Sequence, residues 1–386
     1  MTNKIGVIGG GPTGLIFSLL NKDSNVTIFL LEARSIFARK NDKRALALSN
    51  SSRYILEKIN VWDDLQKNII PIKSIHTSQK GTFGRSKLNA EEFNLSALGY
   101  IVSYGELMSI LEEKIAIQKN VEISYDTKVI KVLGEGINQE VVFNKNEKQA
   151  SYRYNLLVLS DGGQSTIDGL KIKKTENFFQ DSAIVSQVIT DKPHKNIAFE
   201  RFTTSGPIAL LPSHNGTFSL VWTAKNDTIK ALMELNEINF LQSLQEQFGE
   251  RAGLFESCGE RKTFPLSQTY ITDIDNNNIV AIGNAAQTMH PVGGQGLNTG
   301  LRDALTLASM IQGNDMEIST ENLISNYLQS RKAETDGMLK ITEGLATFFA
   351  NDLILVNRFR GLALTILDCS PVLKQKFVKK MSYGKY

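Results

Sequence analysis

Residues 4–34 read "KIGVIGGGPTGLIFSLLNKDSNVTIFLLEAR" and place three structural elements in close succession. Residues 5–8 are a short apolar run, which is typical of a strand buried on both faces. After a glycine-rich turn, residues 15–20 continue as an apolar helix, and residues 26–32 form a second apolar strand. This order predicts a βαβ unit in which the two strands run parallel.

The turn carries glycine at three spaced positions, Gly9, Gly11 and Gly14, and the second strand ends at Glu32. Gly9 permits a tight turn, Gly11 lets a pyrophosphate approach the backbone at the helix start, and Gly14 allows close packing of helix on strand. An acid at the end of the second strand accepts hydrogen bonds from the ribose hydroxyls of an adenosine. Plain βαβ turns also contain glycine, but the strand, helix and acid together favour a dinucleotide site for NAD or FAD.

The bulk properties limit the remaining possibilities. A chain of 386 residues predicts two domains, and 41% hydrophobic with 22% charged residues is typical of a soluble globular protein. The net charge of +3 argues against a general polyanion-binding role. Cys258 and Cys369 are not part of a CxxC pair, so neither a zinc site nor a disulfide framework is predicted, and a reducing, cytoplasmic setting fits.

Two further strand ends resemble the first one in carrying glycine. "NLLVLSDGGQST" is an apolar strand followed by Asp161-Gly162, and "NIVAIGNAAQTMHP" is an apolar strand followed by Gly283-Asn284. Asp-Gly alone is a common turn pair. Because parallel strands end at one edge of a sheet, where ligands bind, all three glycine turns are expected to lie together.

The stretch "GGQGLNTGLRDALTLASMI" is a glycine loop that leads into a helix. Its expected apolar face consists of Leu297, Leu301, Ala304, Leu305 and Ala308. A helix start offers free amides and a partial positive charge, which would stabilise the negative charge of a reduced flavin. Glycine would let the flat ring approach the backbone, and Asn284 could bond a ribityl hydroxyl. This loop therefore favours FAD.

These motifs resemble those of the class A flavoprotein monooxygenases, the group of para-hydroxybenzoate hydroxylase. Three motifs carry the resemblance in order: GxGxxG at Gly9 to Gly14, DG at Asp161-Gly162, and a GD-type motif at Gly283-Asn284. The stretches "KRALALSNSSRYILEKINVWDDL", "GPIALLPSHNGTFSLVWTA" and "GNAAQTMHPVGGQGLNTGLRD" look most like the ubiquinone-biosynthesis hydroxylase subgroup, in particular its polyprenyl-methoxyphenol hydroxylases. The resemblance covers essentially the whole chain.

The resemblance implies a role for individual residues in binding FAD. Glu32 binds the adenosine ribose, Arg44 lies near the pyrophosphate, and Val129 contacts adenine through its backbone. Asp161 and Gly162 belong to a motif associated with FAD and with reduced nicotinamide, and Asn284 stands where relatives usually have aspartate. The residues implied around the cofactor and its isoalloxazine ring are Pro291, Gly294, Gln295, Gly296, Leu297 and Asn298. No catalytic side chain is assigned beyond the flavin-ring environment of Pro291, Gly294 and Gln295.

The resemblance also implies a fold: a Rossmann-like FAD-binding domain interrupted by a β-sheet substrate domain, followed by a C-terminal helical region. The FAD-binding domain is expected over 1–69, 98–175 and 273–345. The substrate domain is expected over 70–97 and 176–272, where "SAIVSQVIT", "NIAFERF", "GPIALLP" and "TFSLVWTA" alternate like strands of an antiparallel sheet with one buried face. The helical region is expected over 346–386.

The implied reaction is aromatic hydroxylation of a polyprenylated phenol in ubiquinone biosynthesis. NADH or NADPH reduces FAD, O₂ reacts to give a flavin C4a-hydroperoxide, and a hydroxyl group passes to the ring. Alternatives are another aromatic substrate or ring position, or a non-catalytic FAD-binding member of a quinone-synthesis complex, since "STIDGLK" lacks the arginine that relatives carry after DG. A flavin halogenase or a prenyl reductase would keep the fold and change the reaction, and the halogenase is disfavoured because the chain has no W-x-W-x-I-P segment.

Three aromatic side chains could serve the site or the scaffold. His290 could act in the flavin loop, but a loop residue held by hydrogen bonds is favoured. Tyr104 stands where relatives often have a more polar side chain near the flavin, and its role is open. Trp222 fits a sheet core at least as well as a substrate cavity.

The tail from Arg358 onward is basic and has apolar residues between its charges. It holds Arg358, Arg360, Lys374, Lys376, Lys379, Lys380 and Lys385 against Asp368 alone. Such a helix could lie on anionic lipid or pack as an ordinary helix with a solvated face. A polyprenyl substrate would lie in the membrane, which favours peripheral contact with its inner face. A spanning helix is not expected, because no apolar run of about 18 residues exists. Other quinone-biosynthesis proteins are possible partners, and nucleic acid is not.

Overall fold

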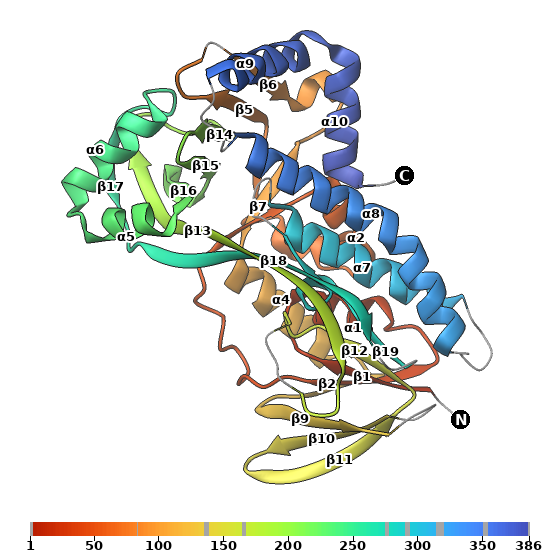
Figure 1. Cartoon of the computed structure of the whole chain (residues 1–386). Coiled ribbons are helices and arrows are strands. Elements are labelled where there is room, and N and C mark those ends of the chain that lie inside the picture. The colour runs from red at the N-terminus through yellow and green to blue at the C-terminus, as the bar shows by residue number, and fades with distance from the viewer. Residues whose placement is uncertain are drawn as a thin grey trace.

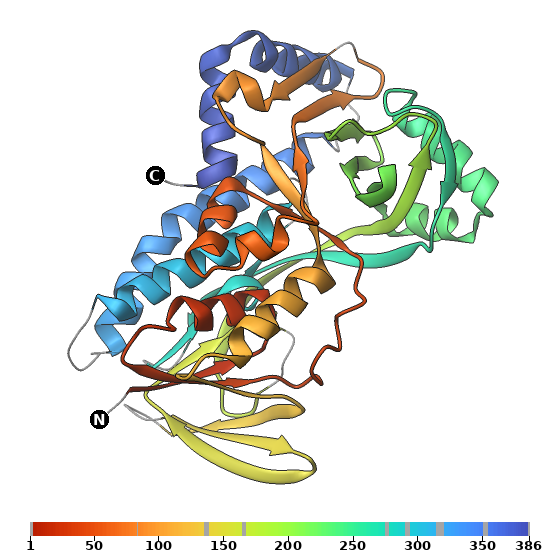
Figure 2. The same ribbon diagram turned by 180° about the vertical axis from the view of Figure 1, so that it is seen from behind.

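The computed structural model describes residues 3–82, 84–134, 139–163, 167–274, 278–289, 294–313, 320–349 and 354–384 (Figure 1). The chain forms a mixed α/β fold that confirms the predicted class. A parallel sheet with its covering layers lies at one end of the molecule, and a larger sheet extends from it toward the C-terminal helices (Figures 1 and 2).

The first sheet has five parallel strands in the order β19-β12-β1-β2-β8. Its strands are β1 (Asn3–Ile8), β2 (Val26–Leu31), β8 (Val121–Ser124), β12 (Leu156–Leu159) and β19 (Ile279–Ala281). β1 and β2 pair in register from Asn3↔Val26 to Ile8↔Leu31, as the βαβ prediction requires. β12 lies on the other side of β1, so the three strands that precede glycine turns are adjacent.

Helices cover one face of the parallel sheet, and a three-stranded antiparallel sheet covers the other (Figure 1). The helices are α1 (Pro12–Leu20), α2 (Asn50–Lys58), α3 (Trp62–Leu65), α4 (Tyr104–Ala116) and α7 (Gln295–Gln312). The covering strands are β9 (Thr127–Leu133), β10 (Gln139–Lys145) and β11 (Lys148–Tyr154). Apolar faces on both sides explain why β1 and β12 read as uninterrupted hydrophobic runs.

The predicted apolar face of α7 is confirmed. Leu301, Ala304 and Ala308 are buried in the main hydrophobic core, and Leu297 and Leu305 pack against it. Their spacing follows the helical period, so one stripe of α7 faces the sheet layer.

A second sheet has nine strands. Eight strands follow the order β20-β18-β13-β16-β15-β14-β5-β6, and β17 pairs with β13. They are β5 (Ser74–Gln79), β6 (Arg85–Asn89), β13 (Ile172–Thr190), β14 (Ile197–Thr203), β15 (Gly206–Pro212), β16 (Phe218–Lys225), β17 (Phe255–Cys258), β18 (Lys262–Ile274) and β20 (Gln287–Thr288). The long strands β13 and β18 pair antiparallel and connect this sheet to the parallel-sheet layer (Figure 1).

The expectation of an antiparallel sheet holds among β13, β14, β15, β16 and β18, but β14 and β5 pair parallel. These two strands are far apart in the chain, so no hairpin forces them to run in opposite directions. Helices α5 (Asn226–Glu234) and α6 (Glu237–Phe248) cover one face of the sheet. Trp222 is buried in that core, which agrees with its interpretation as a sheet core residue.

A small antiparallel sheet and three C-terminal helices complete the fold. The sheet has the order β3-β7-β4, formed by β3 (Ala45–Leu48), β4 (Ile70–Ile72) and β7 (Gly99–Ser103). The helices are α8 (Thr320–Phe349), α9 (Ile354–Cys369) and α10 (Pro371–Tyr383). The boundary expected at 345 falls inside α8, and the division into domain ranges stays a prediction. Across the described ranges, every helix is too short or too polar to cross a membrane.

Candidate functional site

The glycine turn between β1 and α1 has the geometry of a phosphate-binding loop. Gly9 has φ of +104°, and a Cβ placed there would lie 2.6 Å from the Cα of Asp161. A Cβ on Gly14 would lie 2.2 Å from the carbonyl oxygen of Gly9. Both positions therefore require glycine for backbone conformation or close packing.

Gly11 differs from the other two glycines because the space beside it is open. A Cβ on Gly11 would have its nearest neighbour at 3.7 Å, the Nη1 atom of Arg39. Gly11 is the N-cap of α1, Pro12 follows at the first helical position, and no side chain caps the helix start. Uncapped amides with room in front of them suit a pyrophosphate.

Glu32 follows β2 and is held in place by backbone amides. Its Oε2 accepts from the Gly10 amide at 2.6 Å, and its Oε1 accepts from the Arg34 amide at 2.8 Å. Burial raises the pKa of the Glu32 carboxyl, while the Gly10 amide and Arg39 oppose that rise. A small pocket opens here, lined by Gly10, Glu32, Arg34, Ser35, Ala38, Arg39, Met108 and Glu112. This is the position that the fingerprint predicts for the adenosine half of FAD.

Val129, predicted to contact adenine through its backbone, lies on β9 with its side chain buried between the two sheets. It is not one of the residues that line the small pocket. Its role stays a prediction.

Arg39, which the sequence analysis did not identify, lies beside Gly11, and Arg44 pairs with Asp42, so the role of Arg44 near the pyrophosphate stays a prediction. The Arg44 guanidinium forms a two-pronged ion pair with Asp42 and stands 4.8 Å from the Tyr104 ring centroid. Arg39 donates a hydrogen bond to the Tyr104 hydroxyl and reaches toward Gly11. Sequence reasoning missed Arg39 because it lies in an irregular loop, although a basic residue after the second strand is a usable signal. Tyr104, whose role was open, supports both guanidinium groups.

The three glycine turns meet at one edge of the parallel sheet, as the strand order requires. Gly9 adjoins Asp161, and a Cβ on Gly163 would lie 3.3 Å from the carbonyl oxygen of Asn284. The Asp161 carboxylate accepts from the Gly163 amide at 2.9 Å, which holds the DG turn. Gly162 has φ of +78° and open space beside it.

The first turn of α7 is anchored through Asn298. Its Oδ1 accepts from the Ser49 amide at 2.8 Å and from the Ser52 hydroxyl at 2.7 Å. Its Nδ2 donates to the carbonyl oxygens of Ala47 at 2.9 Å and Gly294 at 2.8 Å. Asn298 thus ties the helix start to the β3–α2 junction and sets the direction in which the α7 amides point.

Other residues predicted around the flavin ring surround this helix start. Gly294 has φ of +61°, Gln295 is buried, and a Cβ on Gly296 would lie 3.7 Å from the Asn284 Oδ1 atom. Leu297 packs against the main core. Pro291 and His290 lie outside the described residues.

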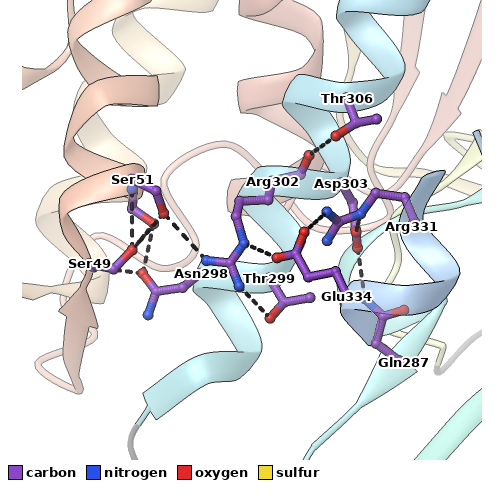
Figure 3. Close-up of polar contacts among 11 residues, drawn as sticks. Ser49, Ser51, Gln287, Asn298, Thr299, Arg302, Asp303, Thr306, Arg331 and Glu334 are labelled. Carbon is purple, nitrogen blue, oxygen red and sulfur yellow. Dashed lines mark hydrogen bonds and ion pairs between the residues drawn. The ribbon is translucent and has the colours of Figure 1, made fainter. Parts of the chain in front are cut away.

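A buried ion network, which the sequence analysis did not identify, supports this region from behind (Figure 3). Asp303 is 1% exposed and accepts from the Gly283 amide at 3.0 Å, the Gln287 side chain at 2.8 Å and Arg331 Nε at 2.7 Å. Burial raises the pKa of the Asp303 carboxyl, and Arg331 opposes that rise. Glu334 pairs with Arg331 and with Arg302. Two carboxylates thus balance two guanidinium groups around the Gly283 turn.

An apolar cavity of about 230 Å³ lies beside the first turn of α7. Strands β3, β5, β6, β7 and β14 form its walls, together with α9, α10 and the α7 residues Gln295 and Asn298. From α9 and α10 it is lined by Leu364, Leu367, Phe377, Val378, Met381 and Ser382. In the described part of the chain, no cluster of His, Cys, Asp and Glu side chains could hold a metal ion.

Comparisons with known proteins identify the family of this chain. Residues 2–342 match the family model described as FAD binding domain. The chain is 25% identical to ubiquinone hydroxylase UbiL of Rhodospirillum rubrum, over 97% of this chain and 88% of that protein. It is 24% identical to 3-demethoxyubiquinol 3-hydroxylase of Escherichia coli, over 98% of this chain and 99% of that protein. The fold is similar to that of p-nitrophenol 4-monooxygenase from Pseudomonas putida, with a TM-score of 0.80, 16% identity and complete coverage of both chains.

The open phosphate loop, the buried acid after β2 and the pocket beside it fit FAD, and the family match covers the same elements. The curated relatives also agree with the resemblance to ubiquinone-biosynthesis hydroxylases. The chain belongs to the FAD binding domain family of class A flavoprotein monooxygenases and is an FAD-dependent hydroxylase.

Proposed function

We propose that the protein hydroxylates the aromatic ring of a polyprenylated phenol in ubiquinone biosynthesis, using NADH or NADPH and O₂. The observation that carries this proposal is the apolar cavity, which adjoins the first turn of α7 on one side and the C-terminal helices on the other. Three relatives are named as ubiquinone or demethoxyubiquinol hydroxylases, and these names support the same substrate class.

The size of the cavity fits an aromatic ring but not a long prenyl chain. An engineered cavity of about 150 Å³ binds benzene, so about 230 Å³ accepts a substituted ring and a few further carbons. The rest of a polyprenyl tail must leave the cavity along an apolar route. Helices α9 and α10 line the cavity with apolar side chains and therefore offer that route.

The residues of this chain have defined tasks in such a reaction. Bound FAD supplies the redox chemistry. The α1 amides and Glu32 hold its diphosphate and ribose, and Asn298 orients the α7 amides toward the ring site. The apolar cavity positions the phenol and excludes water, which would otherwise divert the oxygen chemistry.

The test compares a prenylated methoxyphenol with the same phenol lacking the prenyl group. The purified protein is mixed anaerobically with NADH or NADPH, and flavin bleaching is followed by absorbance with each phenol. The proposal expects the prenylated phenol to accelerate bleaching more, and mass analysis in air to find one added oxygen. Bound flavin that never bleaches faster with any phenol would refute the phenol as the substrate.

We also propose that α9 and α10 contact a membrane surface. Four apolar side chains on these helices face solvent: Leu362, Ile366, Val372 and Leu373, which are 48%, 50%, 61% and 44% exposed. Lys376, Lys379 and Lys380 are exposed nearby on α10. Apolar side chains flanked by lysines suit the interface of an anionic bilayer.

Replacing these three lysines with glutamate should reduce co-sedimentation with vesicles containing anionic phosphatidylserine. The matched control replaces three exposed lysines far from the C-terminal helices: Lys128, Lys145 and Lys148 on the β9–β11 sheet. Equal binding of the two triple variants would refute the membrane contact.

A further inference from the structure

One wall of the mainly apolar cavity carries a row of polar side chains from three neighbouring strands. Glu200 on β14 pairs with Thr77 on β5, and Thr77 pairs with Ser86 on β6. Directly paired residues project from the same face of a sheet, and all three line the cavity. We call Glu200, Thr77 and Ser86 the polar row.

The Glu200 carboxylate has no partner within the described chain. Neighbouring positions on the same face of β14, Ala198 and Phe202, are apolar and buried. Among the described residues, no hydrogen bond or ion pair reaches the Glu200 carboxylate, and the buried Ser86 Oγ likewise lacks a partner there. Ser86 is buried, and Glu200 and Thr77 are half-buried. Enclosed polar groups usually have hydrogen-bond partners, so this row needs an explanation.

No charged side chain of the described cavity lining compensates Glu200. Of the described residues that line the cavity, it is the only charged one. The cavity side chains from the adjacent strands and from α9 are not titratable: Ile75, Thr77, Ser86, Leu88, Leu364 and Leu367. Burial alone raises the pKa of the Glu200 carboxyl to about 7. A carboxylate kept in an apolar cavity without a donor is destabilising, unless a ligand supplies the donor.

We propose that the polar row binds the hydroxyl group of the phenol, with the Glu200 carboxylate accepting the hydrogen bond from the phenolic O–H. The Thr77 and Ser86 hydroxyls lie beside it and can bond the phenol oxygen or an adjacent ether oxygen. The inference rests on the proposed function and deepens it by naming the group that the cavity recognises. It also places the ring and its alkyl substituents against the apolar walls.

This arrangement serves both selection and reactivity. A site that hydrogen-bonds a substrate hydroxyl discriminates strongly against an analogue that lacks it, because the buried polar group then stays unpaired. A phenol that donates to a carboxylate also carries more electron density in its ring, which favours attack by an electrophilic oxygen. Glu200 therefore makes free phenols better ligands than their ethers.

The experiment measures binding rather than turnover. The flavin-loaded protein is titrated with 2-methoxyphenol and with its methyl ether, 1,2-dimethoxybenzene, and the Kd values come from the change in flavin absorbance. The variants are Glu200→Leu, Glu200→Gln and the control Glu250→Gln, an exposed carboxylate of the same part of the chain. Flavin content and circular dichroism confirm that each variant folds.

Wild type and the control should bind the phenol about 10–100-fold more tightly than the ether, the range of a hydrogen bond to a charged group. Glu200→Leu should abolish that preference, and Glu200→Gln should leave a reduced one. In wild type the preference should weaken as the pH falls from 8 to 6, and in Glu200→Leu it should not change. An equal phenol-to-ether ratio in wild type and Glu200→Leu would overturn the inference.

The two proposals can fail separately. If phenol preference depends on Glu200 but no phenol accelerates flavin bleaching, the binding role stands and the proposed phenol substrate fails. If phenols are hydroxylated while the preference is the same in all variants, the hydroxylase proposal stands and the role of Glu200 is refuted.

Discussion

Replacing Arg331 with methionine tests the buried ion network directly. Arg331 is 9% exposed, and its Nε lies 2.7 Å from Asp303 Oδ1, while its Nη1 contacts Glu334. Methionine retains much of the apolar stem and removes the charge. Glu334 keeps Arg302 as a partner, but Asp303 retains only the Gly283 amide and the Gln287 side chain.

The expected loss follows from that uncompensated carboxylate. Breaking a buried ion pair from one side lowers the free energy of unfolding by about 3–5 kcal/mol. Adding Asp303→Asn to Arg331→Met removes the unpaired charge, so the double variant should be more stable than Arg331→Met alone, by about 1–3 kcal/mol. The order of the two stabilities is the sharper prediction, because simple loss of contacts would make the double variant the weaker one.

Urea unfolding, followed by circular dichroism with and without FAD, measures these differences. The control is Lys173→Met, which removes the exposed Lys173–Asp273 pair at 2.9 Å, with side chains 75% and 52% exposed. An exposed pair contributes about 0–1 kcal/mol. The reasoning is refuted if Arg331→Met is no more destabilising than the control, or if the double variant is the less stable of the two.

Three further predictions concern the cofactor loop and the cavity. Gly11→Ala should keep the fold, because the space beside Gly11 is open, but its methyl group would stand where the pyrophosphate approaches and should weaken FAD binding at least about tenfold, measured by flavin fluorescence. Gly14→Ala should instead lower the urea concentration at which the chain unfolds, because its Cβ would meet the Gly9 carbonyl. Arg39→Met should weaken FAD binding more at low salt than at high salt, and equal loss at both would contradict a role beside the phosphates. The pKa of the Glu200 carboxyl is about 7 in the folded protein and 4.5 in the unfolded chain, so the folded protein binds this proton more tightly. The stabilisation of the fold by this proton is therefore complete below pH 4.5 and is lost as the pH rises through 7. Glu200→Gln should remove this pH-dependent loss of stability, which is about 3 kcal/mol in the wild type. The prediction is contradicted if the urea midpoint changes between pH 5 and pH 8 by the same amount in the wild type and in Glu200→Gln.

The cofactor loop was predictable because its signals are local. Gly9, Gly11, Gly14 and Glu32 lie within one βαβ unit, and each has a steric or hydrogen-bonding reason that can be derived from its spacing. The apolar period of α7 was equally local and is confirmed. The meeting of the three glycine turns followed from the parallel order of their strands.

The cavity and the ion network were not predictable for the opposite reason. Glu200 in "IAFERFT" reads as the solvent-facing position of an alternating strand, and only the packing of α9 and α10 encloses it. Arg331 and Glu334 lie in a polar stretch of α8 that resembles any solvated helix. Their burial depends on which surface α8 covers, and no periodicity within α8 specifies that surface.

Helix α7 connects the two halves of the proposed reaction. Its first turn lines the cavity through Gln295 and Asn298, and its next turn carries Arg302 into the ion network. A Cβ on Gly384, just after α10, would lie 2.6 Å from Glu334 Oε1, so the end of α10 packs against the same network. The helices that line the cavity therefore pack against the same ion network as α7, the element proposed to carry the flavin-ring site. Because the same ion network contacts both, a shift of the C-terminal helices should alter the proposed cofactor environment as well as access to the cavity.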